Sequence, residues 1–276
     1  MTAPYVHGYQ PRENERLKEQ ASTLEDLLHG GTTYPAGSRV LEVGCGIGAQ
    51  TVALATRSPG ARFVSIDRQA ESVAQARLAA QAAGLDNVEC LQADVLALPF
   101  EAASFDHVFV CFVLEHLADP GAALARLRRL LKPGGTATVI EGDHGSVLFH
   151  PENAAARDAI ACQAELQRRA GGDAFIGRRL RPLLTGAGFE AVRVSALPVQ
   201  ADADRPDLVD GFTRKSFIPM IDGVREQAVA AGLTSLQRFD AGIQGLNETT
   251  RPDGMFLYTF FKAVGRLPTA TDDLPG

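Results

Sequence analysis

Short apolar runs recur along the first half of the chain and alternate with segments whose apolar residues follow helical spacing. The runs occupy residues 40–43, 63–67, 88–91, 107–111 and 136–140. Runs of this length between turn residues are typical of buried strands, and their alternation with helices is typical of a parallel sheet with crossover connections. The pattern predicts an α/β fold.

The chain on either side of these runs has a different pattern. Leucine and alanine recur at helical spacing over residues 13–29, and Gly30 and Gly31 end the predicted helix. After residue 141 the alternation stops. We expect strands and helices there in another order, with helices over 152–170, 178–186 and most of 207–247, and strands over 189–197 and 255–264.

This organisation divides the chain into four segments. They are an N-terminal helical arm or lid (1–34), an α/β core (35–145), cap helices and closing strands of the same domain (146–267) and a disordered tail (268–276). Ligands of open α/β sheets bind beyond the carboxyl ends of the strands. We therefore expect the arm and the helices over 151–170 and 206–232 to roof a site at that end.

Three glycines follow the first predicted strand at alternate positions, Gly44, Gly46 and Gly48. Glycine lets the backbone turn sharply and lets a ligand lie against the main chain. The helix that follows directs its free N–H groups at such a ligand. This segment predicts a site for a nucleotide-like cofactor.

Two kinds of cofactor fit the glycine spacing. Gly44, Gly46 and Ala49 satisfy the dinucleotide fingerprint GxGxxA, and Asp67 follows at about the distance of a ribose-binding carboxylate. A nicotinamide-dependent oxidoreductase is therefore one candidate. Glu42 argues against it, because a carboxylate two residues before the first glycine would repel a pyrophosphate.

The acidic residue followed by GxGxG resembles the first motif of the class I S-adenosylmethionine-dependent methyltransferases. Later segments are similar in order and spacing: a strand ending on Asp67, the pair Asp94-Val95, and the turn at residues 131–135 before the fifth strand. The resemblance is specific over residues 39–141. It implies a Rossmann-like, seven-stranded sheet with flanking helices, whose last strand runs antiparallel at or near the edge.

The resemblance also implies S-adenosylmethionine as the cofactor and S-adenosylhomocysteine as the product. In the family, the carboxylate at the position of Asp67 holds both ribose hydroxyls, the acid at Asp94 receives the adenine amino group, and the residue at Val95 covers the ring. The expected cofactor-binding residues are Glu42, Gly44, Cys45, Gly46, Gly48, Asp67, Arg68, Asp94, Val95 and Val110, with Tyr9 from the arm.

Candidate contacts for a methyl acceptor follow the fourth and fifth strands, in loops expected over residues 110–116 and 141–150. A roofed apolar pocket suits a small molecule better than a macromolecule. Each phenylalanine also has an ordinary core position as its alternative. The expected substrate-binding residues are Phe112, Asp143, Phe149 and Phe212, with Phe175 and Phe217 as further wall candidates.

Two histidines are candidates for a general base, which helps when the acceptor must lose a proton. His144 follows Asp143, and His116 lies in the segment LEHL. Each also has a structural alternative: His144 as a turn cap or a pocket wall, and His116, by the resemblance, as a residue that packs beside the cofactor. His144, His150 and Asp143 do not have metal-site spacing, so we expect no metal.

Four segments resemble a narrower group. The arm YQPRENERLKEQASTLEDLLH and the segments CFVLEHL, IEGDHGS and YTFFKA look like bacterial methyltransferases of the teleocidin type. Those enzymes methylate an alkene carbon of prenylated indole alkaloids, which implies a small, largely apolar natural product of secondary metabolism and a carbocation stabilised by aromatic rings. The alternatives are methylation of another metabolite at nitrogen or oxygen, and a non-catalytic relative that binds the cofactor.

Composition limits the partners and the compartment. The net charge of −6 argues against a nucleic-acid partner, and the longest apolar run, residues 108–114, is too short to span a membrane. Four cysteines without metal spacing indicate buried, reduced thiols in a cytoplasmic protein. Abundant arginine and alanine indicate a bacterial source, and the amphipathic arm would allow a homo-oligomer by exchange between copies.

Overall fold

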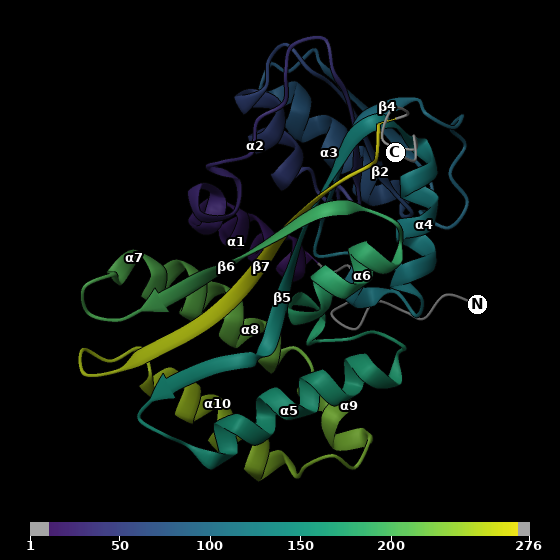
Figure 1. The fold of residues 1–276 in the computed structure, drawn as a ribbon. Helices are drawn as coiled ribbons and strands as arrows, with labels where there is room; N and C mark the ends of the chain where they lie inside the picture. Colours follow the sequence, from purple (N-terminus) through teal and green to yellow (C-terminus); the bar gives the residue numbers. More distant parts are fainter. Residues whose placement is uncertain (1–10, 270–276) are drawn as a thin grey trace.

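The computed structural model describes residues 11–269 and contains a seven-stranded sheet with the strand order β3-β2-β1-β4-β5-β7-β6 (Figure 1). Six strands run in the same direction, and β7 alone among the seven lies antiparallel, between β5 and the edge strand β6. The strands are β1 (Arg39–Val43), β2 (Arg62–Asp67), β3 (Val88–Gln92), β4 (Phe105–Cys111), β5 (Leu131–His150), β6 (Glu190–Ala201) and β7 (Met255–Arg266). The predicted α/β class and the antiparallel position of the last strand are confirmed.

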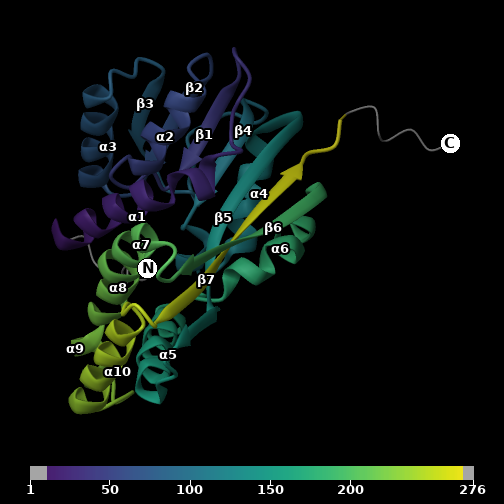
Figure 2. The same cartoon turned by 90° about the vertical axis from the view of Figure 1, so that its left-hand side faces the viewer.

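Helices cover both faces of the sheet and form a cap beyond one end of it. In Figure 2, α1, α2 and α3 lie on one side of the sheet, and α4 and α6 lie on the other. The helices of the core are α1 (Pro11–His29), α2 (Ala49–Arg57), α3 (Ala70–Ala82), η1 (Leu114–His116), α4 (Pro120–Leu130), η2 (Ile176–Arg179) and α6 (Leu180–Gly186). The cap contains α5 (Ala154–Arg169), α7 (Pro206–Leu208), the π-helix η3 (Val209–Phe217), α8 (Ile218–Asp222), α9 (Arg225–Ala230) and α10 (Leu236–Glu248).

The alternation of side chains along each strand fills a core on both faces of the sheet. In β1, Val40 packs in the cluster that contains Leu54 of α2, whereas Leu41 packs in the cluster that contains Leu124 of α4. A strand that is buried on both faces reads as a continuous apolar run, because neither side contacts water. For this reason the apolar runs in the sequence predicted the positions of these strands closely.

The fifth strand is longer than the sequence analysis predicted. We expected a strand over residues 136–140 and a loop over 141–150, but β5 continues to His150 and pairs with β7 on both sides of an irregularity between Asp143 and Leu148. The loop prediction was therefore wrong. Glycines and polar residues in this segment indicated a loop, yet β7 pairs with both ends of it, and the N–H groups of His144 and Gly145 bond Ala174 and the Asp143 side chain. The boundary drawn at residues 145/146 falls inside this strand.

The arm is attached to the sheet at the carboxyl end of α1. Lys262 of β7 donates its Nζ to the carbonyl oxygen of Leu28 at 3.1 Å and to the hydroxyl of Thr32 at 2.5 Å. A cation at this end complements the partial negative charge of the helix terminus. Further along, α1 packs against η3, where a Cβ added to Gly211 would lie 2.2 Å from Oγ1 of Thr23.

The other predicted helices correspond to observed ones. The segments 152–170 and 178–186 contain α5 and α6, and residues 207–247 are mostly helical. The tail prediction for 268–276 and the arm prediction for residues before Pro11 concern mainly residues outside those that the structure describes. Between residues 11 and 269, no helix is long and apolar enough to span a membrane.

Candidate active site

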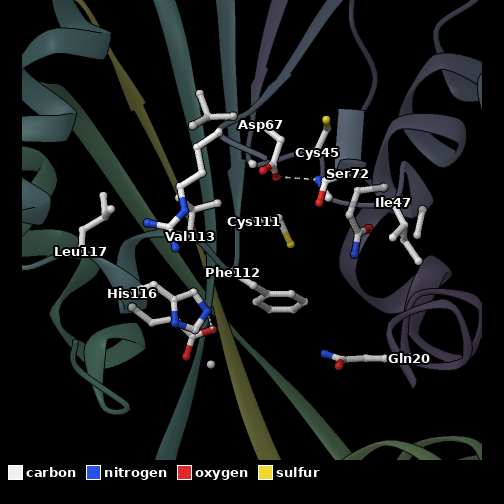
Figure 3. Close-up of a pocket in the computed structure, with 18 of the residues that line it drawn as sticks. Gln20, Cys45, Ile47, Asp67, Ser72, Cys111, Phe112, Val113, His116 and Leu117 are labelled. Atoms are coloured by element: carbon white, nitrogen blue, oxygen red, sulfur yellow. Dashed lines mark hydrogen bonds and ion pairs between the residues drawn. The ribbon is translucent and has the colours of Figure 1, made fainter. Parts of the chain in front are cut away.

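A cavity of about 260 Å³ lies beyond the carboxyl ends of β1, β2 and β4, where ligands of open α/β sheets bind. Figure 3 shows the ring of Phe112 in the middle of this cavity, with Asp67 toward one end and Gln20 of α1 toward the other. The Asp67 end contains the glycine loop, and we call it the cofactor half. The opposite end lies under α1, η3 and α8, and we call it the acceptor half.

The glycine loop has a backbone that side chains would disturb. Gly44 has φ +73°, and a Cβ there would lie 2.3 Å from Cγ2 of Val113. Gly48 has φ +84°, and a Cβ there would lie 2.7 Å from Cα of Ala76 in α3. Positive φ angles and close contacts both require glycine. Gly44 therefore shapes the cavity wall, whereas Gly48 allows α3 to approach the start of α2.

Two carboxylates lie in the cofactor half. Asp67 accepts the N–H of Gly46 at 3.0 Å and the N–H of Gln69 at 2.9 Å, which fixes its orientation at the end of β2. Asp94 accepts the N–H of Leu96 at 2.8 Å. Each carboxylate has lone pairs beyond those that the backbone occupies. A ligand with neighbouring hydroxyls at Asp67 and an amino group at Asp94 fits this donor and acceptor pattern.

Most of the predicted cofactor residues line the cavity. Those in its wall are Gly44, Cys45, Gly46, Asp67, Arg68, Asp94 and Val95. Three others do not line it: Gly48 packs against α3, Val110 is fully buried in the apolar core, and Glu42 lies beneath the loop. Tyr9 lies outside the described residues.

Glu42 supports the loop from below and is not part of the wall. Its Oε2 accepts the hydroxyl of Thr51 in α2 at 2.7 Å and the hydroxyl of Ser65 in β2 at 2.6 Å. Burial raises the pKa of Glu42, and these two hydrogen bonds oppose that rise. The expectation of a direct cofactor contact at Glu42 is therefore corrected: its carboxylate joins β1, β2 and α2 where the loop begins.

The acceptor half is rich in aromatic rings. Phe112 lies 5.3 Å from Phe260 between ring centroids, and Phe212 and Phe217 lie 5.8 Å and 5.6 Å from Tyr258. All five line the cavity. The rings come from the end of β4, from η3 and from β7, so the sheet and the cap both contribute to this wall. Aromatic walls of this kind suit an apolar or cationic ligand.

Three other predicted wall residues lie elsewhere. Phe149 is buried in the core beneath the guanidinium of Arg157, and Phe175 is 40% exposed, outside the cavity. Asp143 is only 1% exposed and forms a two-bond ion pair with Arg178, with distances of 2.6 Å and 2.8 Å. Its carboxylate is already satisfied, so Asp143 fixes η2 against β5 and does not contact the cavity.

His144 lines the acceptor half and is 7% exposed. Its Nδ1 lies 3.1 Å from the hydroxyl oxygen of Tyr258, whereas its Nε2 is buried without a hydrogen-bond partner among the described residues. Burial lowers the pKa of His144, which favours the neutral ring at pH 7. A neutral imidazole accepts a proton at the ring nitrogen that carries no hydrogen.

His116 also lines the cavity, beside Glu115 in η1. Its Nε2 lies 3.6 Å from Oε1 of Glu115. Glu115 is a wall residue that the sequence analysis did not select. Its backbone carbonyl accepts the N–H of Asp173, and a glutamine of the cap, Gln167, donates to its carboxylate.

Several other wall residues were also missed. Tyr258 and Phe260 come from the last strand, Gln20 and Arg16 from α1, and Ser216 and Met220 from the cap. The aromatic character of the segment 255–264 was visible in the sequence, but its neighbours in space were not. Among residues 11–269, no group of three histidine, cysteine, aspartate or glutamate side chains is arranged to hold a metal ion.

Comparison with known proteins assigns the core to a class. Residues 41–139 match the family described as methyltransferase domain. The chain is 35% identical over 217 residues to an uncharacterised 37.1 kDa protein in transposon TN4556 of Streptomyces fradiae, covering 78% of this chain and 59% of that protein. It is 28% identical over 228 residues to the 27-O-demethylrifamycin SV methyltransferase of Amycolatopsis mediterranei, covering 81% and 76%.

Solved structures show the same fold. The structure of the 4+2 cyclase SpnF superposes with a TM-score of 0.57 at 17% identity and covers 98% of this chain and 99% of that one. The core is a class I S-adenosylmethionine-dependent methyltransferase domain, as the glycine loop and strand order indicate. S-adenosylmethionine is the cofactor of this class. The chain spans about three fifths, 59%, of the length of its Streptomyces relative.

Proposed function

We propose that this protein transfers a methyl group from S-adenosylmethionine to a small, largely apolar natural product. The observation that carries the proposal is the continuity of one cavity from Asp67 and the glycine loop to His144 and the aromatic rings. A donor at the first end and an acceptor at the second would meet beside Phe112. The similarity to a methyltransferase named for a rifamycin substrate supports an acceptor of secondary metabolism.

The cofactor supplies an activated methyl group on a positively charged sulfonium when it is bound. The residues of the chain bind, orient and exclude water. Asp67 and Asp94 present acceptors for the nucleoside, and the rings of η3 and β7 enclose the acceptor half. Holding two reactants in line supplies a large part of the rate enhancement in such reactions.

His144 is the proposed general base for an acceptor that carries an exchangeable proton. His144 lines the acceptor half, its buried Nε2 has no hydrogen-bond partner among the described residues, and its Nδ1 lies 3.1 Å from the hydroxyl oxygen of Tyr258. In the proposed tautomer Nδ1 carries the hydrogen and donates it to the hydroxyl oxygen of Tyr258, so that Nε2 takes the proton of a hydroxyl or an amine. Tyr258 is then a positioning residue, and His116 is a wall residue beside the cofactor.

The resemblance to teleocidin-type enzymes makes an alkene carbon of a prenylated indole alkaloid the first acceptor to test. Methylation of an alkene needs no base before transfer, and it leaves a carbocation that aromatic faces stabilise. Five rings line the acceptor half, which supports this acceptor. His144 would then remove a proton after transfer, so the order of the two events separates carbon from oxygen or nitrogen as the acceptor atom.

The main alternative is binding of the cofactor without methyl transfer, to which the fold shared with a cyclase adds weight. An oxidoreductase has less support. Tyr258 and Lys262 have the spacing Tyr-x-x-x-Lys, but both lie on β7, where four residues span about 13 Å. Lys262 is also bonded to Leu28 and Thr32.

Four expectations stay predictions: the cytoplasmic location, the bacterial source, the absence of a nucleic-acid partner and a homo-oligomer formed through the arm.

Calorimetric titration with S-adenosylmethionine, NAD and NADP tests the cofactor assignment. Micromolar binding of S-adenosylmethionine alone is expected, and binding of a nicotinamide instead would overturn the proposal. A screen of indole and terpenoid acceptors by mass spectrometry then tests transfer. A gain of one methyl group is the expected product, and cofactor binding without any product would favour the non-catalytic alternative.

His144→Ala tests the base. We expect the single-turnover rate to fall at least about tenfold with unchanged cofactor affinity, since general bases contribute roughly a hundredfold or more. Tyr258→Phe should shift the pH profile of the rate, because it removes the partner of Nδ1. His150→Ala, on an exposed histidine of the same strand, is the control. An unaltered rate in His144→Ala would contradict the assignment of His144 as the general base.

A further inference from the structure

The proposed function gives no role to one carboxylate in the wall of the acceptor half. Glu115 lies in η1, its side chain is 14% exposed, and it lines the cavity. A carboxylate in a mostly apolar wall loses much of its hydration, so it is costly unless a partner or a ligand compensates for the loss. Its position is therefore informative about what enters the cavity.

Buried amides of the cap hold this carboxylate in place. Gln167 of α5 donates its Nε2 to Oε2 of Glu115 at 3.0 Å and to the backbone carbonyl of Glu115 at 3.1 Å. Gln163 donates in turn to Oε1 of Gln167 at 2.8 Å. Both glutamines are at most 1% exposed. A chain of buried amides fixes the direction of a carboxylate but does not neutralise its charge.

The backbone beneath Glu115 is equally constrained. Its carbonyl also accepts the N–H of Asp173 at 2.8 Å, and a Cβ added to Gly172 would lie 2.3 Å from the same oxygen. The segment that follows α5 therefore packs directly against η1. Two elements far apart in sequence fix one acidic side chain, which is the kind of support that binding residues require.

The charge of Glu115 affects the pKa values of two residues in the acceptor half, Tyr258 and His144. Burial raises the pKa of Tyr258, and the Glu115 carboxylate raises it further. At His144, burial lowers the pKa and Glu115 opposes this. His144, a residue more than nine-tenths buried whose Nε2 has no hydrogen-bond partner among the described residues, lines the same half. The carboxylate of Asp143, in contrast, is compensated by its ion pair with Arg178.

Arg16, Arg68 and His116 are basic side chains of the wall, and two of them have contacts that bear on Glu115. Arg16 of α1 donates to Gln20 at 2.8 Å and to Ser216 at 3.4 Å, so its guanidinium is engaged in joining the arm to the cap. His116 approaches Glu115 only to 3.6 Å, which is beyond hydrogen-bond distance. Neither side chain gives the carboxylate a directed, charge-assisted bond.

We infer that the acceptor carries a protonated nitrogen, which Glu115 binds by an ion pair while the aromatic faces of the acceptor half surround the cation. This inference rests on the proposed function and narrows its substrate class to an apolar molecule with a basic amine. A carboxylate together with aromatic faces is the usual protein environment for organic ammonium groups. The amine is a recognition group whichever atom is methylated.

The experiment compares two indole probes that differ in charge. Tryptamine carries an ammonium at pH 7, and 3-(2-hydroxyethyl)indole is its neutral counterpart. The chain contains no tryptophan, so probe fluorescence anisotropy reports binding without interference from protein indole. Titrations are made in the presence of S-adenosylhomocysteine. We expect the amine to bind at least about tenfold more tightly than the alcohol, as a partly buried ion pair with cation–π contacts provides.

Glu115→Gln should reduce this preference to within about twofold and leave the affinity for S-adenosylhomocysteine unchanged. Gln167→Leu should reduce it in part, because the carboxylate loses its orientation. Glu101→Gln, on an exposed carboxylate, makes the same change in charge and should leave the preference intact.

Equal binding of the two probes by the unaltered protein would overturn the inference, and so would no binding of either. The inference would also be overturned if Glu115→Gln still preferred the amine to the alcohol. The separate titration with S-adenosylhomocysteine distinguishes the two proposals. Failure to bind S-adenosylhomocysteine counts against the proposed function, whereas normal binding without a preference for the amine counts against the role of Glu115 alone.

Discussion

Replacement of Asp67 by alanine is the most direct perturbation of the cofactor half. The carboxylate accepts the N–H groups of Gly46 and Gln69 at 3.0 Å and 2.9 Å, and we expect it to accept two ribose hydroxyls as well. Hydrogen bonds to a charged group contribute about 1.5 to 3 kcal/mol each. Loss of the two ribose bonds should therefore weaken binding by about 3 to 6 kcal/mol, a Kd at least about a hundredfold higher.

The assay is calorimetric titration of the purified protein with S-adenosylhomocysteine. Asp67→Asn keeps one neutral acceptor and should give an intermediate Kd, which separates the loss of charge from the loss of the side chain. Thermal unfolding without ligand shows whether each variant folds. A folded Asp67→Ala protein that binds within threefold of the unaltered one would refute the reasoning, since the ribose would then be held by other groups.

Two further perturbations test the framework of the site. Gly142→Ala places a Cβ 2.2 Å from the hydroxyl of Tyr258, so we expect a loss of about 1 to 3 kcal/mol in the free energy of unfolding and a changed pH profile of turnover. Unchanged stability and pH profile would show that Tyr258 moves freely. Burial lowers the pKa of His29 from 6.5 to about 4, so the neutral form favours the folded state. That stability is complete above pH 6.5 and is lost as the pH falls toward about 4, by up to roughly 3 kcal/mol. Urea unfolding between pH 7 and 4.5 should show this loss, and His29→Gln should reduce it; equal losses in both proteins would contradict the assignment.

Most of the residues that the sequence assigned to the cofactor lie together in one half of the cavity, and their binding roles stay predictions. The loop of Gly44 and Gly46 follows a strand directly, and Asp67 ends the next strand in the sheet. Parallel strands bring their carboxyl ends to one edge, so neighbours in the motif become neighbours in space. Glu42, Gly48 and Val110 do not line the cavity, because a sequence motif does not distinguish a residue that contacts a ligand from one that supports the loop.

The acceptor half was predicted poorly because its residues depend on pairing between distant strands. Gly142 pairs with Phe260, and His144 approaches Tyr258 across the same pair of strands. Side chains of a strand alternate between faces. Had residues 141–150 been recognised as a strand, Asp143 would have been assigned to the face opposite His144. Glu115 depends on contacts with α5, and no local pattern of the sequence indicates them.

The length of β5 has a consequence for how ligands enter. Its 20 residues, together with the 12 residues each of β6 and β7, carry the sheet from the core to the cap without a flexible joint. The donor and acceptor ends of the cavity are therefore parts of one stiff body, and the distance between them does not change by closure of two domains. On the side of the arm, α1 closes the cavity and is held at two places: Lys262 bonds its carboxyl end, and Ser216 of η3 bonds Arg16 and Gln20. An acceptor that entered beneath α1 would have to separate this helix from η3, while the spacing of the reacting groups in the sheet stays constant.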